Sequence, residues 1–150
     1  MSVSVHPLIS QSLGSGLAGA VALNVLHETV RQLAPDAPRV DLLGKRGIVK
    51  GYEAVGAKPP RNEKLYGMAL AGDLISNGLY YGLVGLNPKQ PLLTGLALGT
   101  LAGIGAVTLP GPLGLGEKPT KRTTATATMT VGWYVVGGLV AGAIFKRLRL

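Results

Sequence analysis

Hydrophobic residues along this chain gather in long runs that carry almost no charge. Residues 1–27, 90–116 and 123–145 contain no Asp, Glu, Lys or Arg, and residues 65–88 contain only Asp73. A helix needs about 20 mostly apolar residues to cross the hydrocarbon core of a bilayer, and each run provides that length. The pattern therefore predicts an all-α, polytopic membrane protein with four transmembrane helices.

Prolines and polar segments limit these helices. Because proline lacks a backbone N–H and disfavours helix at the residue before it, the prolines at positions 7, 88, 91 and 110 should lie near helix ends. The predicted helices cover residues 8–32, 65–86, 91–109 and 125–146, and they form one membrane domain over residues 1–150. A soluble domain of this length would have to hide helices that are apolar on every side.

The polar segment 34–64 between the first two predicted helices has a periodicity of its own. Pro38 and Pro59 bracket a stretch in which apolar residues such as Val40 and Leu43 recur at three- and four-residue spacing. We expect an amphipathic helix on the cytoplasmic surface, where its basic residues attract anionic lipid head groups by about 1 kcal/mol each. The alternative is a plain connector that covers the end of the bundle.

Charge and composition indicate how the predicted helices are oriented in the membrane and which kinds of chemistry the chain lacks. Charged residues make up only 15% of the chain, and the absence of cysteine excludes disulfides and thiolate chemistry. The net charge of +8 does not indicate nucleic-acid binding, because Lys and Arg lie between the apolar runs rather than along one polar face. Eleven of these fifteen residues lie in or next to residues 34–64 and 110–124. The positive-inside rule therefore places both loops in the cytoplasm and both termini on the opposite side, although the basic end 146–150 opposes this orientation.

The N-terminus lacks a basic residue before its apolar run, so we expect no cleavable signal peptide. A compact, multi-span chain of this kind suits the inner membrane of a bacterium.

Small residues recur at helical spacing in every predicted helix. Gly95, Gly99 and Gly103 form a four-residue repeat in the third helix, and Gly138 and Gly142 repeat the spacing in the fourth. Such stripes let helix backbones approach closely in lipid, where apolar helices have no hydrophobic reason to associate. They predict either tight packing within one chain or contacts with a second copy or a larger membrane complex.

Polar residues cluster on one face of each of the first two predicted helices. The first helix contributes Asn24, His27, Glu28 and Arg31, and the second contributes Asp73, Asn77 and Tyr80. Since the two helices run antiparallel, their polar faces should meet at similar depth. Ionisable groups inside a membrane are functional candidates, here for binding or for a proton or ion relay that leads from Asp73 through His27 and Glu28 to the cytoplasm. The alternative is that the cluster only joins the helices by hydrogen bonds.

These patterns leave three hypotheses for function. The first is a structural or interaction subunit, or a self-associating scaffold, of a membrane complex. The second is a small transporter or channel that moves protons, cations or a small solute through the Asp73 cluster. An enzyme that acts on a membrane substrate is the weakest, because the chain has no Walker loop, no serine nucleophile elbow and no paired histidines. We predict no catalytic residue, metal site or cofactor.

Overall fold

The computed structural model describes residues 5–150, with side chains from residue 7 onward. The described chain consists of helices and connecting turns, without strands. The five long helices are α1 (Val5–Leu33), α2 (Val40–Ala54), α3 (Asn62–Gly82), α4 (Pro91–Thr108) and α6 (Thr124–Leu148). A short 3-10 helix η1 (Leu83–Leu86) continues α3, and one helical turn, α5 (Lys118–Lys121), precedes α6. The all-helical class expected from the sequence is confirmed.

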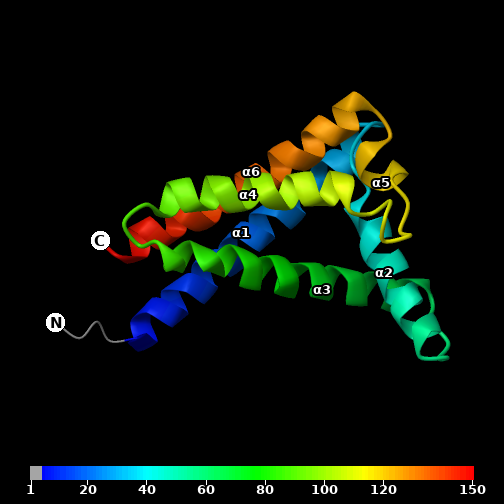
Figure 1. Cartoon of the computed structure of the whole chain (residues 1–150), viewed down its shortest axis with the longest axis horizontal. Coiled ribbons are helices and arrows are strands. Elements are labelled where there is room, and N and C mark those ends of the chain that lie inside the picture. The colour runs from blue at the N-terminus through cyan, green and yellow to red at the C-terminus, as the bar shows by residue number, and fades with distance from the viewer. Residues whose placement is uncertain (1–4) are drawn as a thin grey trace.

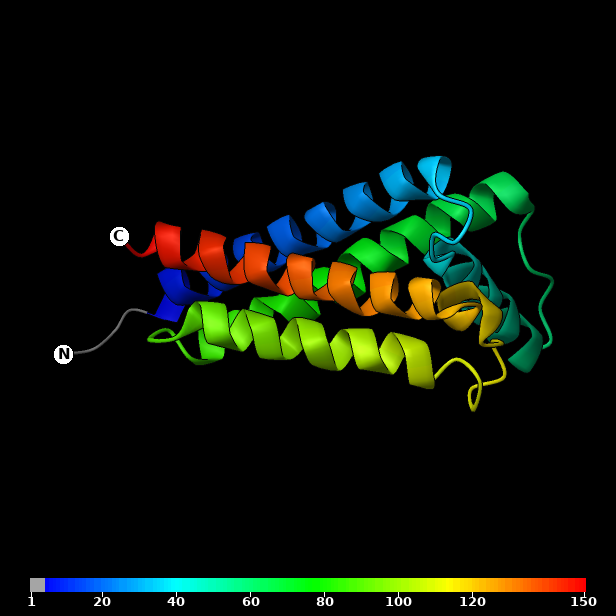
Figure 2. The ribbon, with the colours of Figure 1, turned by 90° about the horizontal axis from the view of Figure 1, so that it is seen from above.

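Four of the helices form an elongated bundle, and α2 crosses one end of it (Figures 1 and 2). The most extensive packing joins α4 to α6, while α1 packs against both α3 and α6. The start of α1 and the end of α6 lie at the end of the bundle opposite α2 and α5. Although α3 and α4 follow one another along the chain, they contact each other little and diverge toward α2.

Three helices are long and apolar enough to cross a membrane: Pro7–Leu33, Pro91–Thr108 and Thr124–Leu148. The predicted helices 8–32, 91–109 and 125–146 are thus confirmed as helices that could span a membrane. The predicted span 65–86 is not among them, because α3 contains Asp73, Asn77 and three tyrosines and is therefore less apolar.

The observed helix ends differ from the predicted ends by a few residues. Most notably, α3 begins at Asn62, three residues before the predicted start, and Glu63 in its first turn is favourable at the positive end of a helix dipole. At the other end, the predicted 65–86 helix tightens into η1 after Gly82. There the chain passes close to α1, since a side chain added at Gly85 would overlap Ser12.

Glycines bring the backbones of α4 and α6 into direct contact. A Cβ atom added at Gly95 would overlap the carbonyl oxygen of Gly138, and one added at Gly142 would overlap that of Pro91. Gly99 and Gly103 of α4 lie against the backbone of α6 nearer its N-terminal end. The glycine stripes of α4 and α6 are therefore occupied by packing within one chain.

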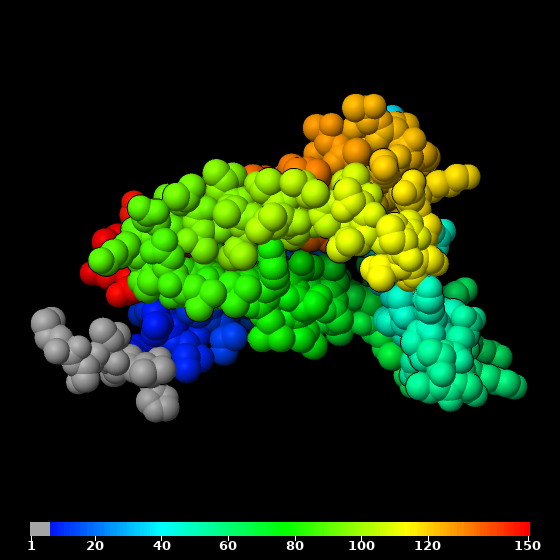
Figure 3. Space-filling view, in the orientation of Figure 1, coloured from blue at the N-terminus to red at the C-terminus, as the bar shows by residue number. Residues whose placement is uncertain are grey.

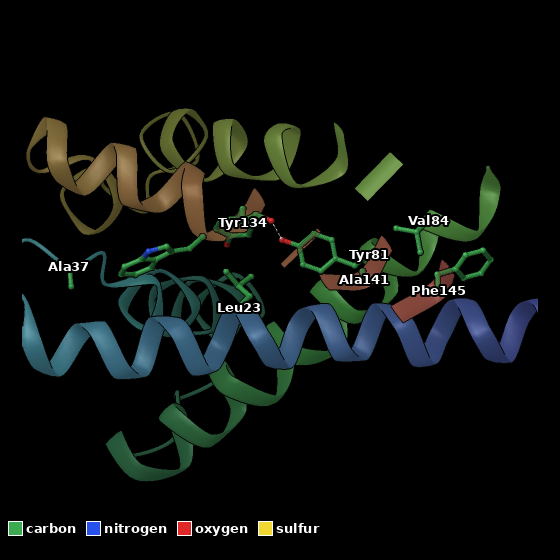
Figure 4. Close-up of a cluster of buried hydrophobic side chains, with 8 residues drawn as sticks. Leu23, Ala37, Tyr81, Val84, Tyr134, Ala141 and Phe145 are labelled. Atoms are coloured by element: carbon green, nitrogen blue, oxygen red, sulfur yellow. Dashed lines mark hydrogen bonds between the residues drawn. The ribbon is translucent and has the colours of Figure 1, made fainter. Parts of the chain in front are cut away.

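A small aromatic core fills the space between α1, η1 and α6 (Figure 4). The Tyr81 hydroxyl donates a hydrogen bond of 2.7 Å to the carbonyl oxygen of Tyr134, and Leu23, Val84 and Phe145 are fully buried beside them. Inside a membrane, such a bond satisfies a hydroxyl that finds no water. Exposed positions on the outside of the bundle include large apolar side chains, as at Val25 and Leu93.

Helix α2 is fastened to the loop that follows α4. Arg46 and Lys50 each donate a hydrogen bond of 2.6 Å to a carbonyl oxygen of this loop, those of Leu115 and Leu113 respectively. The backbone N–H of Arg39 also donates to Pro119 at 2.7 Å. The predicted amphipathic helix thus forms as α2, and two of its basic residues hold the end of the bundle together.

Candidate functional site

A cavity of about 600 Å³ lies where α3 and α4 diverge. The space-filling view shows a recess between these helices on the side near α2 (Figure 3). Helix α3 provides one wall, α4 the opposite wall, and α2 closes the end. Asn24, His27 and Tyr134 line it from α1 and α6. Most other lining residues are apolar, such as Leu70 and Ala106.

Asp73 lies in the wall of this cavity and is held by two amides. The side-chain nitrogen of Asn24 donates to one carboxylate oxygen at 2.7 Å, and that of Asn77 donates to the other at 2.9 Å. Among the side chains of residues 7–150, no Lys, Arg or His nitrogen lies within 4.0 Å of this carboxylate. Asp73 is therefore a hydrogen-bonded carboxylate without a cationic partner, next to open space.

The helical spacing and the packing of α1 on α3 explain why the two amides reach the Asp73 carboxylate. Asn77 is one turn beyond Asp73 on α3, so both side chains share a face. Close packing of α1 on α3, where Gly16 lies against the backbone of Gly78, brings Asn24 within reach of Asp73. Asn24 also donates to the carbonyl oxygen of Ala20 at 3.0 Å, which satisfies its second amide hydrogen.

A second polar network surrounds the α2 end of the cavity. Arg31 pairs with Glu28 at 2.5 Å, and the Tyr66 hydroxyl donates to the other oxygen of Glu28 at 2.9 Å. Arg31 also lies 3.8 Å from Asp41 of α2. Lys45 lies 3.9 Å from Asp41 and over the ring of Tyr66, 5.0 Å from its centre. The network thus joins α1, α2 and α3.

Asp41 is the centre of this network. Its side chain is only 9% exposed, and Arg39 donates two hydrogen bonds to it, at 2.8 and 2.9 Å. Burial by itself would raise the pKa of Asp41, but the hydrogen bonds and charge of Arg39, together with the charges of Arg31 and Lys45, outweigh it. The pKa of Asp41 therefore lies below its usual value of 3.8.

This lowered pKa predicts an acid-sensitive attachment of α2. A carboxylate whose folded-state pKa is depressed contributes stability above its unfolded pKa and loses it as the pH falls through the folded value. We expect α2 to stay attached above about pH 4 and to loosen below it. In Asp41→Asn, the protection of the α2 backbone amides against hydrogen exchange, relative to the intrinsic rate at each pH, should already be low at neutral pH and should not fall further on acidification. Asp36→Asn is the matched control, because Asp36 pairs with Arg122 at an exposed position; equal exchange in both variants would contradict the prediction.

His27 does not continue the polar chain toward Asp73. Its ring packs between Trp133, with ring centres 5.0 Å apart, and Tyr134, with centres 6.0 Å apart. The His27 Nε2 atom is buried and has no hydrogen-bond partner in the described part of the chain, which has side chains from residue 7 onward. A relay from Asp73 through His27 to Glu28, as the sequence suggested, therefore has no continuous hydrogen-bond path among the described residues. The buried Trp133 packs inside the bundle.

The other sequence candidates have clear positions. The Tyr80 hydroxyl donates to the carbonyl oxygen of Leu98 at 3.0 Å, so Tyr80 links α3 to α4 across the cavity. The five candidate packing glycines lie in the α4–α6 contact, away from the polar cluster. Sequence reasoning missed Asp41, Tyr66 and the α4 wall. The α4 wall could have been found from the three- and four-residue spacing of Ala102, Gly105 and Ala106 on one face of α4, which Leu109 continues just after the helix.

Comparisons with known proteins find no family model, curated protein or solved structure that matches this chain. Among residues 5–150, no group of three His, Asp or Glu side chains is placed to hold a metal ion. The site consists of a carboxylate that accepts hydrogen bonds from two side-chain amides, an apolar wall, and a network of ion pairs at one end. Its chemistry follows from these groups.

Proposed function

We propose that the protein is a small-solute transporter of the bacterial inner membrane and that the cavity is its binding site. The observation that carries this proposal is the position of Asp73, a carboxylate that has no cationic partner among the described side chains and faces a cavity between the helices. Burying such a group costs several kcal/mol, about 3 kcal/mol at the centre of a membrane helix by insertion scales. A structural role needs only neutral hydrogen bonds, whereas a binding role needs the charge.

Helix α3 is the fourth span in this proposal. Its 21 residues reach about 32 Å, close to the thickness of the hydrocarbon core. Ile75 and Leu79 are more than half exposed on its outer side, as lipid contact requires. With four spans, α2 and the loop 110–124 lie in the cytoplasm and both termini on the opposite side, in agreement with the larger number of basic residues at the α2 end.

Thiol labelling tests the proposal, because the chain has no cysteine of its own. In Ser76→Cys, the new thiol lies in the cavity wall; in Ile75→Cys, the matched control, it lies on the outer face of the same helix. We expect a membrane-impermeant, water-soluble thiol reagent to label Ser76→Cys from either face of sealed vesicles and to leave Ile75→Cys unmodified. Labelling from neither face would mean a dry cavity and would reject transport. Labelling from one face only would indicate a fixed binding site.

A self-associating scaffold or subunit is the second candidate. The glycine stripes of α4 and α6 do not support this candidate, because these helices pack against each other through them within one chain. Gly67 of α3 has open space beside it, so a second copy could approach the helix there. The mass of the protein in detergent distinguishes the two: a scaffold forms a stable oligomer that Gly67→Leu disrupts, and a monomeric carrier does not.

Anionic lipids are the proposed partners of the α2 end. Arg46 and Lys50 bind loop carbonyls. Lys58 and Arg61 are exposed in the segment after α2 and remain free for lipid head groups. Lipid attraction at this end therefore depends on residues after α2 more than on α2 itself.

A further inference from the structure

The charges around the cavity oppose the charge of the whole chain. The chain has seven acidic and fifteen basic residues, yet three acidic residues line the cavity, namely Glu28, Asp41 and Asp73, and only one basic residue, Arg31. Arginines and a lysine at the α2 end balance Glu28 and Asp41. The negative charge of Asp73 has no such balance within the described residues, so it is available to a ligand.

The two amides leave Asp73 able to accept more hydrogen bonds. A carboxylate has about four acceptor positions, and Asn24 and Asn77 occupy one on each oxygen. Both amides present N–H groups to the carboxylate and stabilise its charged form. This arrangement suits an ammonium group or another compact cation that donates to, or lies against, the remaining positions.

The size and lining of the cavity indicate an organic body on that cation. A volume of about 600 Å³ is in the range of sites for drug-sized ligands and far exceeds that of one water molecule, about 30 Å³. Leu70, Leu101, Ala106 and Leu109 make its walls largely apolar. A bare divalent ion takes six or more oxygen ligands, which a single carboxylate with two N–H donors does not provide.

Aromatic rings also form part of the cavity wall. Tyr80 and Tyr134 line the cavity, and a cation within about 6 Å of an aromatic face is attracted by the ring. The Tyr80 hydroxyl is already bound to the backbone of α4, so its ring is fixed as part of the wall. We infer that the ligand of this cavity is an organic cation with an apolar body, held at its charged end by Asp73. This inference rests on the proposed function and names its substrate class.

Two probes of almost equal shape and opposite charge test this inference: tetraphenylphosphonium and tetraphenylborate. Binding to the full chain in nanodiscs is followed by fluorescence of Trp133, the only tryptophan, which packs against the cavity residue His27. We expect saturable binding of tetraphenylphosphonium and weak, unsaturable partition of tetraphenylborate. Asp73→Asn should weaken tetraphenylphosphonium binding about tenfold or more, whereas Asp36→Asn, an exposed acid outside the cavity, should bind as the unmodified chain does.

The comparison of the two probes needs no variant, so it stays decisive if Asp73→Asn folds poorly. Equal saturable binding of both probes, binding unaffected by Asp73→Asn in a folded protein, or no saturable binding of the cation would each overturn the inference. In the last case, labelling of Ser76→Cys from both faces would leave the proposed transport standing with another class of solute. Failure of that labelling would instead reject the transport proposal itself.

Discussion

Gly138→Ala should destabilise the bundle by about 3 kcal/mol, since the added methyl group overlaps the backbone of α4 and neither helix has a side chain there that can move aside. The carbonyl oxygen of Gly95 lies in the space that the methyl group would take. To relieve the overlap, α4 and α6 must separate along their whole contact, which is the most extensive in the molecule. Unfolding of the purified protein by heat or by sodium dodecyl sulfate, followed by circular dichroism, measures the loss.

Gly132→Ala provides the matched control on the same helix. A Cβ atom at Gly132 meets no other atom within 4 Å, and alanine favours helix over glycine by up to about 1 kcal/mol in water. We therefore expect this variant to be as stable as the unmodified chain or slightly more stable. If Gly138→Ala and Gly132→Ala behaved alike, the direct backbone contact between α4 and α6 would be wrong.

Asn77→Leu should destabilise the protein by about 2 kcal/mol, because it removes one of the two donors that hold the buried Asp73 carboxylate. The double variant Asp73→Leu/Asn77→Leu should recover most of this loss, since no uncompensated charge remains and the new side chains fill the wall. Asn24 would keep a partner in that variant, the carbonyl oxygen of Ala20. The same unfolding measurement applies to both variants.

This pair of variants also separates the two interpretations of the polar cluster. If Asp73 serves a ligand, the double variant folds normally and no longer binds tetraphenylphosphonium. If the cluster only joins α1 to α3, the double variant loses more stability than Asn77→Leu does, because the interhelical hydrogen bond from Asn24 to Asp73 is lost as well as the bond within α3. A more stable but inactive double variant would contradict the purely structural interpretation.

The sequence predicted the helices well because hydrophobic length is a strong and local signal. The uncharged runs give α1, α4 and α6 directly, and proline and polar residues limit them to within a few residues. The meeting of Asn24, Asn77 and Asp73 also followed from spacing, because antiparallel neighbours of known length fix the depth of each residue.

The sequence did not indicate which helices pack together, or that α3 and α4 diverge toward α2. The glycine repeats predict close contacts but do not name the partner, so the pairing of α4 with α6 and of α1 with α3 required the structure. Asp41 was missed as the centre of a network, because it lies in the connecting segment and its partner Arg31 belongs to another helix. The predicted continuity from Asp73 to His27 failed because Trp133 and Tyr134 enclose the imidazole.

The glycine contacts also determine which parts of the molecule can deform. Where one backbone rests directly on another, as between Gly95 and Gly138 or between Gly16 and Gly78, no side-chain rotamers are available to absorb a displacement. Each of these helix pairs is consequently a stiff body. The contact between α3 and α4 is far less extensive, and these helices are joined by η1, a short turn and the hydrogen bond from the Tyr80 hydroxyl to the carbonyl oxygen of Leu98. Because α1 also packs closely on α6, where Gly19 lies against the carbonyl oxygen of Gly137, the two pairs do not move freely past each other, and any widening of the space around Asp73 would first break the Tyr80 hydrogen bond.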